Sequence, residues 1–275
     1  MSLHPRHILR DLEQRARKRF GQHFLHDDVL VDRIVRAARI APGDPVVEIG
    51  PGLGILTRAL LRADAKVTAV ELDRDLAEYL RGVLPSVRLV EADALKLNWA
   101  DVVDLTAGHR AKVVANLPYN VGTHVLMSLL RSPTCFASVS VMLQQEVVDR
   151  LMATPGTKKW GALSVEAQVR GRPVYLLPVP PGSFHPPPKV QSGVVRFDLF
   201  DAPQCGDVSP DWFDKVVRFA FSQRRKTVRN SLGAHVGKER AGEALAAAGI
   251  DPGLRAETLD LDAFRALALE LQRLN

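Results

Sequence analysis

The sequence predicts an α/β fold: a mostly parallel sheet with helices on both faces and an antiparallel edge, followed by a small all-helical domain. Short apolar runs alternate with helical patterns from residue 45 to residue 200, a rhythm typical of parallel sheets. A glycine-rich turn follows the first run, and the chain beyond residue 211 shows helical periodicity without strands. We therefore expect two domains, residues 1–200 with a basic N-terminal arm and residues 201–275.

The expected strands are short, and most are followed by a helical stretch. Five of them should lie parallel in the sheet: Pro45–Gly50, Lys66–Glu71, Val87–Asp93, Lys112–Leu117 and Ser138–Leu143. Two later runs, Pro173–Val179 and Gly193–Phe200, are separated by a proline-rich loop instead of a helix. Because parallel strands need a long crossover, we expect these two strands to form an antiparallel edge.

The segment from Asp201 to Asp211 (DAPQCGDVSPD) carries prolines, a glycine and aspartates, and it is interpreted as a linker. Three helices are expected after it: Trp212–Ala220, Lys238–Ala248 and Asp260–Leu274. No strand pattern interrupts them, which is why the second domain is expected to be all-helical.

Composition narrows the classes of function. The net charge of +6 favours a polyanionic partner such as nucleic acid. Two cysteines are too few for a disulfide framework or a four-cysteine zinc site, so we expect no metal and a reducing cytoplasm. No apolar stretch approaches the roughly 18 residues that cross a bilayer, and the N-terminus lacks a secretory signal. We expect a cytoplasmic protein without membrane attachment, with a monomer as the default.

The turn after the first strand reads EIGPGLG from Glu48 to Gly54. Gly50 and Gly52 would let the backbone approach a ligand closely. Ile55 and Thr57 stand where the third glycine of a dinucleotide fingerprint would be. The E-x-G-x-G-x-G spacing instead resembles S-adenosylmethionine-dependent methyltransferases, which implies their Rossmann-like fold and S-adenosylmethionine as the methyl donor.

Carboxylates end the next two strands. Glu71 lies 21 residues after Gly50, where it can accept hydrogen bonds from both hydroxyls of a cofactor ribose. Asp93 ends the third strand and can accept a hydrogen bond from the cofactor's adenine amine. Because ligands in open α/β sheets bind at the carboxyl ends of the strands, we expect one cofactor site there.

The fourth strand ends in Asn116-Leu117-Pro118-Tyr119, which resembles the (Asn/Asp)-Pro-Pro-Tyr motif of amino-methyltransferases with Leu117 in place of a proline. The amine of adenine is a poor nucleophile because its lone pair is delocalised into the ring. The Asn116 side-chain oxygen and the Leu117 carbonyl would accept hydrogen bonds from its N–H groups, and the lone pair would then be available for reaction. Tyr119 would offer a face to the extruded base.

Further motifs make the resemblance specific to one family. They are KRFGQHFL at residues 18–25 (KRFGQNFL in the family), NLPYN at 116–120, LQQEV at 143–147 (LQKEV), FHPPPKV at 184–190 (FxPPPKV) and FSQRRKTVRNSL at 221–232 (FxxRRKTLRNxL). They span most of the chain. The sequence resembles the bacterial ribosomal RNA small-subunit adenine N6,N6-dimethyltransferases.

The resemblance implies a reaction and several site residues. The expected substrate is a pair of adjacent adenosines in a hairpin loop near the 3′ end of 16S ribosomal RNA, within immature small subunits during ribosome biogenesis. His23 and Leu25 are expected to line the cofactor pocket, and Tyr119 and Phe184 to sandwich the target adenine. His23 stands where most bacterial members have Asn, which leaves its polar contact with the cofactor open.

Two basic clusters are expected to hold the phosphates of the flanking RNA stem. They are Arg15, Arg17, Lys18 and Arg19 before the core, and Arg224, Arg225, Lys226 and Arg229 in the helical domain. They are far apart in sequence, and our hypothesis places them on one face around the pocket mouth.

Three other functions fit part of the pattern. A 23S rRNA adenine methylase of the erythromycin-resistance kind shares the fold and a QHFL segment, but NLPYN and RRKTVRN favour the small-subunit family. A DNA adenine methylase would usually carry a separate target-recognition region, and none is visible. A non-catalytic RNA-binding assembly factor is disfavoured because Glu71, Asp93, Asn116 and Tyr119 are all intact.

Overall fold

The computed structural model describes residues 23–103 and 109–274. The chain divides into two compact units: unit 1 is residues 1–148 and 173–201, and unit 2 is residues 149–172 and 202–275. This division differs from the expected one because residues 149–172 belong with the C-terminal helices. The physical reason is packing within unit 2, because Trp160 and Val165 belong to the buried apolar cluster of the C-terminal helices. A fully buried ion pair adds to it, in which Arg170 donates to both carboxylate oxygens of Asp214 at 2.9 and 2.8 Å.

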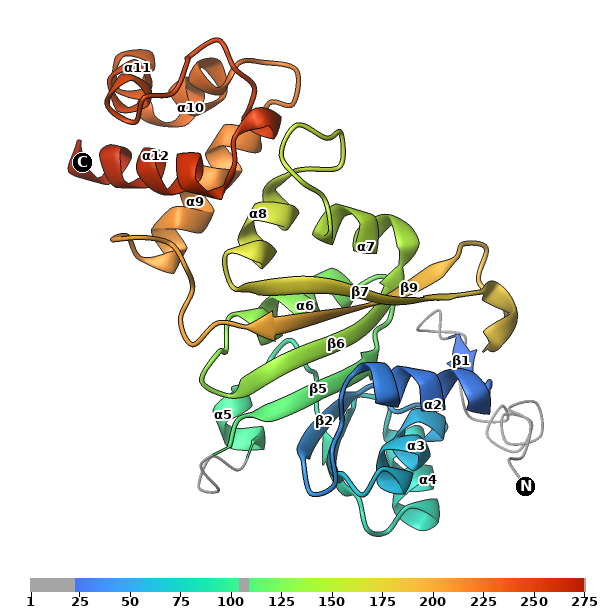
Figure 1. Cartoon of the computed structure of the whole chain (residues 1–275). Coiled ribbons are helices and arrows are strands. Elements are labelled where there is room, and N and C mark those ends of the chain that lie inside the picture. The colour runs from blue at the N-terminus through green and yellow to red at the C-terminus, as the bar shows by residue number, and fades with distance from the viewer. Residues whose placement is uncertain (1–22, 104–108, 275) are drawn as a thin grey trace. The chain divides into compact units, whose positions relative to one another are not determined.

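Unit 1 is built on a seven-stranded sheet with the order β4-β3-β2-β5-β6-β9-β7 (Figure 1). Its strands are β2 (Pro45–Ile49), β3 (Lys66–Glu71), β4 (Arg88–Glu91), β5 (Ala111–Asn116), β6 (Phe136–Gln144), β7 (Gly171–Val179) and β9 (Ser192–Leu199). The five strands from β4 to β6 run parallel, and β9 runs antiparallel to β6. The predicted parallel sheet with an antiparallel edge is confirmed, with strand bounds within two residues of those expected.

A short antiparallel pair, β1 (Phe24–Leu25) with β8 (Phe184–His185), lies apart from the main sheet. It was not expected, because two-residue strands leave no alternating pattern in a sequence. Its register places Leu25 opposite Phe184 and therefore joins the last two residues of the KRFGQHFL motif to the proline-rich loop.

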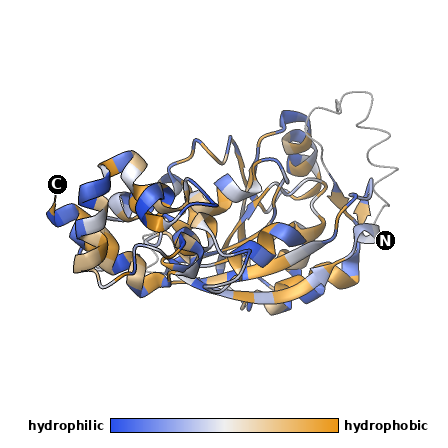
Figure 2. Ribbon diagram, turned by 90° about the horizontal axis from the view of Figure 1, so that it is seen from above, coloured by the Kyte–Doolittle hydropathy of each residue, from blue (hydrophilic) through white to orange (hydrophobic). Residues whose placement is uncertain are grey.

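Helices cover both faces of the sheet. They are α2 (Asp28–Ala37), α3 (Ile55–Arg62), α4 (Arg74–Val83), α5 (Trp99–Val102), α6 (Gly122–Leu130) and α7 (Gln145–Leu151), the last running to the edge of unit 2. In Figure 1, α2, α3 and α4 lie together on one side of the sheet, and α5 and α6 lie on the other. The helices carry both polar and apolar residues (Figure 2), as expected when one helical face packs on the strands.

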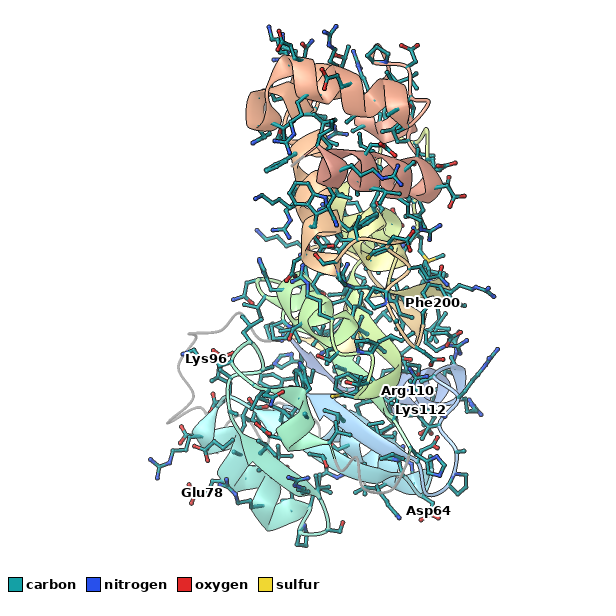
Figure 3. The ribbon with its side chains drawn as sticks, turned by 90° about the vertical axis from the view of Figure 1, so that its left-hand side faces the viewer. Asp64, Glu78, Lys96, Arg110, Lys112 and Phe200 are labelled. Atoms are coloured by element: carbon teal, nitrogen blue, oxygen red, sulfur yellow. The ribbon has the colours of Figure 1, made fainter. Side chains whose placement is uncertain are left out.

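Polar contacts close the amino-terminal edge of the sheet. Lys112 at the start of β5 donates to Asp44 at 2.7 Å and to the Arg39 carbonyl at 2.6 Å. Arg110, labelled near it in Figure 3, pairs with Asp201. These contacts fasten strand ends and loops together, so the opposite, carboxyl-terminal edge is the one that offers a ligand site.

Unit 2 contains α8 (Ala162–Gln168), α9 (Pro210–Phe221), α10 (Val228–Val236), α11 (Lys238–Ala247) and α12 (Leu261–Arg273). The three expected helices are confirmed, whereas α10 was not predicted. Its N-cap is Thr227, whose hydroxyl accepts from the Asn230 N–H, and its buried residues include Val228 and Leu232. Across the described part of the chain, no helix is long and apolar enough to span a membrane.

Candidate active site

A cavity of about 300 Å³ opens at the carboxyl edge of the sheet in unit 1, where β2 lies between β3 and β5. Chain order reverses at this point, and open α/β sheets bind ligands at such a reversal. The loops after β2, β3, β4 and β5 all contribute to its wall. Every residue expected to bind the cofactor or the reacting amine lines this cavity: His23, Leu25, Gly50, Gly52, Glu71, Asp93, Asn116, Leu117, Tyr119 and Phe184.

The cavity is lined by acidic residues. Four carboxyl groups line it, and no Lys or Arg does so among the residues that the structure describes: the four are Glu48, Glu71, Asp73 and Asp93. The pyrophosphate of a dinucleotide would meet no cation there. A ligand with positive charge would be attracted instead, and S-adenosylmethionine carries a sulfonium and an ammonium group. The donor and acceptor chemistry of the site therefore fits S-adenosylmethionine.

The glycine-rich turn after β2 brings the backbone against β1. Gly52 has a φ of 56°, and a Cβ atom on it would lie 3.2 Å from the ring of Phe24. Side chains of L residues rarely adopt this conformation, so the turn needs glycine both for its backbone and for the close approach. The N–H of Gly52 donates to Glu71 Oε2 at 3.3 Å, which ties the turn to the end of β3.

Glu71 is 4% exposed and is held by backbone donors. Its Oε1 accepts from the Asp73 N–H at 2.9 Å, and its Oε2 accepts from Gly52. Burial raises the pKa of the Glu71 carboxyl above its usual value, and these two N–H groups oppose the rise. The carboxyl group is thus fixed in orientation at the cavity wall, as an acceptor for ribose hydroxyls must be.

Glu48, on β2, was not assigned a role from the sequence, although it begins the E-x-G-x-G-x-G pattern. Its side chain is 1% exposed, and its Oε2 makes no hydrogen bond to any atom of the described residues. Burial raises the pKa of Glu48 to about 8, the carboxyl of Glu71 adds to the rise, and contact with Thr57 opposes it in part. An unsatisfied buried carboxyl on the cavity wall is a site for a hydrogen-bonding group of a ligand.

Asp93 combines a local role with a place on the cavity wall. Its Oδ1 accepts from the Leu95 N–H at 3.0 Å, a turn that caps the chain after β4. Two apolar side chains that the sequence did not single out flank the cavity here, Leu72 at 55% exposure and Leu95 at 44%. Leu72 lies one position after Glu71, and Leu95 lies two positions after Asp93. This position after a carboxylate at a strand end is the sequence feature that could have predicted them as cavity residues. Together they offer apolar surface to a flat ring beside an acceptor.

The turn after β5 presents an acceptor to the cavity. The Asn116 Nδ2 donates to the His23 carbonyl at 3.5 Å, and this contact leaves the Oδ1 of the amide for a ligand. The Leu117 N–H donates to the Met142 carbonyl at 3.3 Å, and the Leu117 side chain is buried. The Pro118 carbonyl then accepts from the first turn of α6, so the turn after β5 is fastened at both ends.

The two expected aromatic residues differ in exposure. Tyr119 is half-buried; its ring lies 5.6 Å from that of His23, and its hydroxyl lies 2.6 Å from Ser192 Oγ. Burial raises the pKa of Tyr119 above its usual value, so the phenol is neutral at physiological pH. Phe184 also lines the cavity but is only 2% exposed, so it forms part of the wall. His23 Nδ1 contacts the Pro186 carbonyl at 2.7 Å.

The structure bears on only one of the two basic clusters. Arg15, Arg17, Lys18 and Arg19 lie outside the described residues. Arg224, Arg225 and Lys226 are exposed in the turn between α9 and α10, and Arg229 is exposed on α10. The Arg224 guanidinium donates to the carbonyl of Lys158 at 2.9 Å. The exposed Lys158, which the sequence did not single out, therefore extends this basic surface of unit 2.

Comparison with known proteins decides the family. A family model described as "Ribosomal RNA adenine dimethylase" matches residues 13–273. The chain belongs to this family. It is 44% identical over 265 residues to "Ribosomal RNA small subunit methyltransferase A" of Pseudomonas aeruginosa, covering 95% of this chain and 97% of that protein. The protein of the same name from Desulfitobacterium hafniense is 47% identical over 257 residues, or 92% and 91% of the two chains.

Two solved structures show the same architecture as this chain. A dimethyladenosine transferase from Plasmodium falciparum superposes with a TM-score of 0.77 at 24% identity, over 91% of this chain and 98% of that one. The 23S rRNA methyltransferase ErmE gives a TM-score of 0.67 at 25% identity, over 90% and 99%. The Rossmann-like methyltransferase fold predicted from the glycine spacing is confirmed.

Proposed function

We propose that this protein transfers methyl groups from S-adenosylmethionine to N6 of two adjacent adenosines in a hairpin loop near the 3′ end of 16S ribosomal RNA. One observation carries the proposal: an acid-lined cofactor cavity and the Asn116–Tyr119 turn share one space. Membership of the ribosomal RNA adenine dimethylase family supports it. So do relatives named for the small subunit, which are 44% and 47% identical over nearly the whole chain.

The acidic side of the cavity binds the methyl donor. When bound, S-adenosylmethionine supplies an electrophilic methyl group on a positively charged sulfur. Glu71 accepts hydrogen bonds from the ribose hydroxyls, and Asp93 accepts one from the adenine amine. Leu72 and Leu95 would offer apolar contact to that ring, and His23 lines the same cavity.

The neutral side of the cavity receives the target base. Asn116 Oδ1 and the Leu117 carbonyl accept hydrogen bonds from the two N–H groups of the adenine amine. These two hydrogen bonds draw the amine toward tetrahedral geometry. The amine lone pair would then be free to take the methyl group, with the C–S electron pair returning to sulfur and the surplus proton leaving to solvent. Tyr119 supports the base by stacking and stays neutral throughout, because burial raises the pKa of its phenol.

Double methylation follows from the neutrality of the amide. A monomethylated amine keeps one N–H bond, so one of the two acceptors loses its donor in the second transfer. A buried carboxylate left in this way would carry an uncompensated charge, whereas the amide oxygen of Asn116 carries none. The same site can therefore act twice on one nitrogen and give N6,N6-dimethyladenosine.

The basic clusters hold the RNA by its phosphates. Arg224, Arg225, Lys226 and Arg229 form one such surface in unit 2, and the arm from Arg15 to Arg19 supplies the other. We place the reaction in the cytoplasm, on immature small ribosomal subunits, and take the active species to be a monomer. The two basic clusters would bind phosphates of the RNA stem while the adenosines of the loop reach the cavity.

Methyl transfer to isolated ribosomal subunits tests the proposal. The protein is incubated with S-adenosylmethionine carrying a tritiated methyl group and with immature small or large subunits, and nucleosides are identified by mass spectrometry after digestion. We expect label in 16S RNA as N6,N6-dimethyladenosine. The fold shared with ErmE makes a 23S methylase the second candidate, and label confined to 23S RNA would establish it. Exclusive monomethyladenosine after long incubation, or no label, would contradict the proposal.

A further inference from the structure

The far end of the Tyr119 ring is anchored to a strand distant in sequence. The phenol oxygen lies 2.6 Å from Oγ of Ser192, the first residue of β9. Ser192 is 0% exposed, so its hydroxyl is shielded from competition with water. Ser192 itself is not part of the cavity lining, whereas Tyr119 is. The hydrogen bond therefore acts on the cavity from outside it, through the tyrosine ring.

The sheet register explains how two residues 73 positions apart meet. Asn116 at the end of β5 pairs with Met142 of β6, and Gln144 at the end of β6 pairs with Ser192. Because β9 runs antiparallel, its first residue lies at the carboxyl edge of the parallel strands. The turn that carries Tyr119 leaves β5 at this edge, and the tyrosine hydroxyl reaches across to Ser192.

A second contact, with the ring of His23, supports the ring of Tyr119. The ring of His23 lies 5.6 Å from the ring of Tyr119 at an interplanar angle of 35°. His23 is itself tied to the proline-rich loop through the Pro186 carbonyl. One contact fixes the hydroxyl end of Tyr119 and the other bounds its ring, so the plane of the ring is determined before any base arrives.

We propose that Ser192 is a positioning residue for methyl transfer: its hydroxyl holds the Tyr119 ring in the orientation that receives the target adenine. The inference rests on the proposed function, since it requires the base to stack on Tyr119. A stacked base that can tilt carries its amine away from the line of attack, and a displacement of about 1 Å can slow an oriented reaction by about a hundredfold. Because His23 also bounds the Tyr119 ring, loss of the hydrogen bond to Ser192 should cause only part of this reduction in rate.

Kinetics of matched variants test the role. Under single-turnover conditions at saturating RNA and cofactor, Ser192→Ala should lower the rate constant about tenfold. The affinity for S-adenosylmethionine, measured by calorimetry, should stay unchanged because Ser192 does not line the cavity. The matched control is Ser140→Ala: Ser140 is 1% exposed in β6, and its hydroxyl has no partner among the described residues. That variant should retain the normal rate.

A double-mutant cycle separates this role from a general loss of structure. Tyr119→Phe removes the same hydrogen bond from its other end, so it should slow the reaction as much as Ser192→Ala, and the two changes together should slow it no further. Effects that multiply in the double variant, or a normal rate in either single variant, would overturn the inference. Should Ser192→Ala unfold at the assay temperature, the rate of the half-buried Tyr119→Phe variant still decides the matter.

Failure of the inference can be told apart from failure of the proposed function. Tyr119→Ala should abolish most methyl transfer if the target base stacks on this ring. A normal rate in Tyr119→Ala would show that the target base does not stack on Tyr119. The argument for a positioning role of Ser192 would then also fail. A large loss in Tyr119→Ala with no loss in Ser192→Ala would leave the stacking intact and refute only the positioning role.

Discussion

The buried carboxyl of Glu48 makes the stability of unit 1 depend on pH, and replacing it with glutamine should remove most of that dependence. Burial raises the pKa of Glu48 to about 8 in the folded protein, whereas the ordinary value is 4.5. The folded state therefore holds this proton more tightly than the unfolded state does. The stabilisation is fully present below the ordinary pKa and is lost as the pH rises through the folded value.

The size of the effect follows from the two pKa values. Each pKa unit of difference corresponds to about 1.4 kcal/mol, so the change from 4.5 to about 8 corresponds to about 5 kcal/mol between the two extremes. Most of this loss should occur between about pH 5 and pH 8, with a slope near 1.4 kcal/mol per pH unit. Glu48→Gln keeps the shape of the side chain and has no proton to lose. Glu71, whose pKa burial also raises, should leave the variant a residual dependence of the same sign.

Urea unfolding of the cofactor-free protein at about pH 5, 6, 7 and 8 provides the assay. Hydrogen exchange of the β2 amides reports on unit 1 separately from the helices of unit 2. Glu78→Gln is the matched control, because Glu78 is an exposed glutamate on α4 (Figure 3) and the chemical change is the same. Parallel loss of stability with pH in the wild type and in Glu48→Gln would show that Glu48 is ionised in the folded protein and would refute the reasoning.

Three further variants test the cofactor, target and RNA surfaces. Glu71→Ala should weaken S-adenosylmethionine binding by about 1.5–3 kcal/mol in calorimetry because it removes a charged acceptor, and equal affinity would exclude Glu71 from the ribose site. Asn116→Ala should retain RNA affinity but lose most of the single-turnover rate, since the side chain acts in the chemical step; a near-normal rate would reduce Asn116 to a turn residue. Arg224→Glu with Arg225→Glu should weaken RNA binding and flatten its salt dependence by about one unit of slope for each lost phosphate contact, with cofactor affinity unchanged. Equal affinity and parallel salt lines would count against a phosphate-binding surface.

The local pattern of the sequence predicted the sheet well and the division of the chain less well. Strand bounds agree within two residues because each apolar run is short and bounded by polar or glycine residues. The transfer of residues 149–172 to unit 2 depends in part on the buried pair of Arg170 with Asp214, which are 44 residues apart. Nothing in the sequence near Arg170 distinguishes a buried cation from an exposed one, so the pattern around it predicted only another βα segment.

The candidate site shows the same contrast. Glu71, Asp93 and Asn116 could be predicted to share a cavity because the carboxyl ends of parallel strands meet at one edge of the sheet. The raised pKa of Glu48 depends on complete burial against α3 and on the nearby carboxyl of Glu71, which spacing alone does not reveal. The contact of Ser192 with Tyr119 depends on the antiparallel register of β9 against β6, a long-range pairing for which the sequence holds no local signal.

The acidic and the neutral polar residues of the cavity come from different strands and loops. Its carboxyl groups come from β2, β3, β4 and the loops that follow them, whereas β5 and its loop contribute the neutral Asn116 and Tyr119. In the proposed reaction, positive charge would start on the sulfur of the donor and pass with the methyl group to the target nitrogen, which would lie beside neutral acceptors. An acceptor with full negative charge at Asn116 would hold the proton of the methylated amine and oppose release of the base. A neutral acceptor lets that proton leave to solvent, and the nitrogen becomes available for its second methyl group.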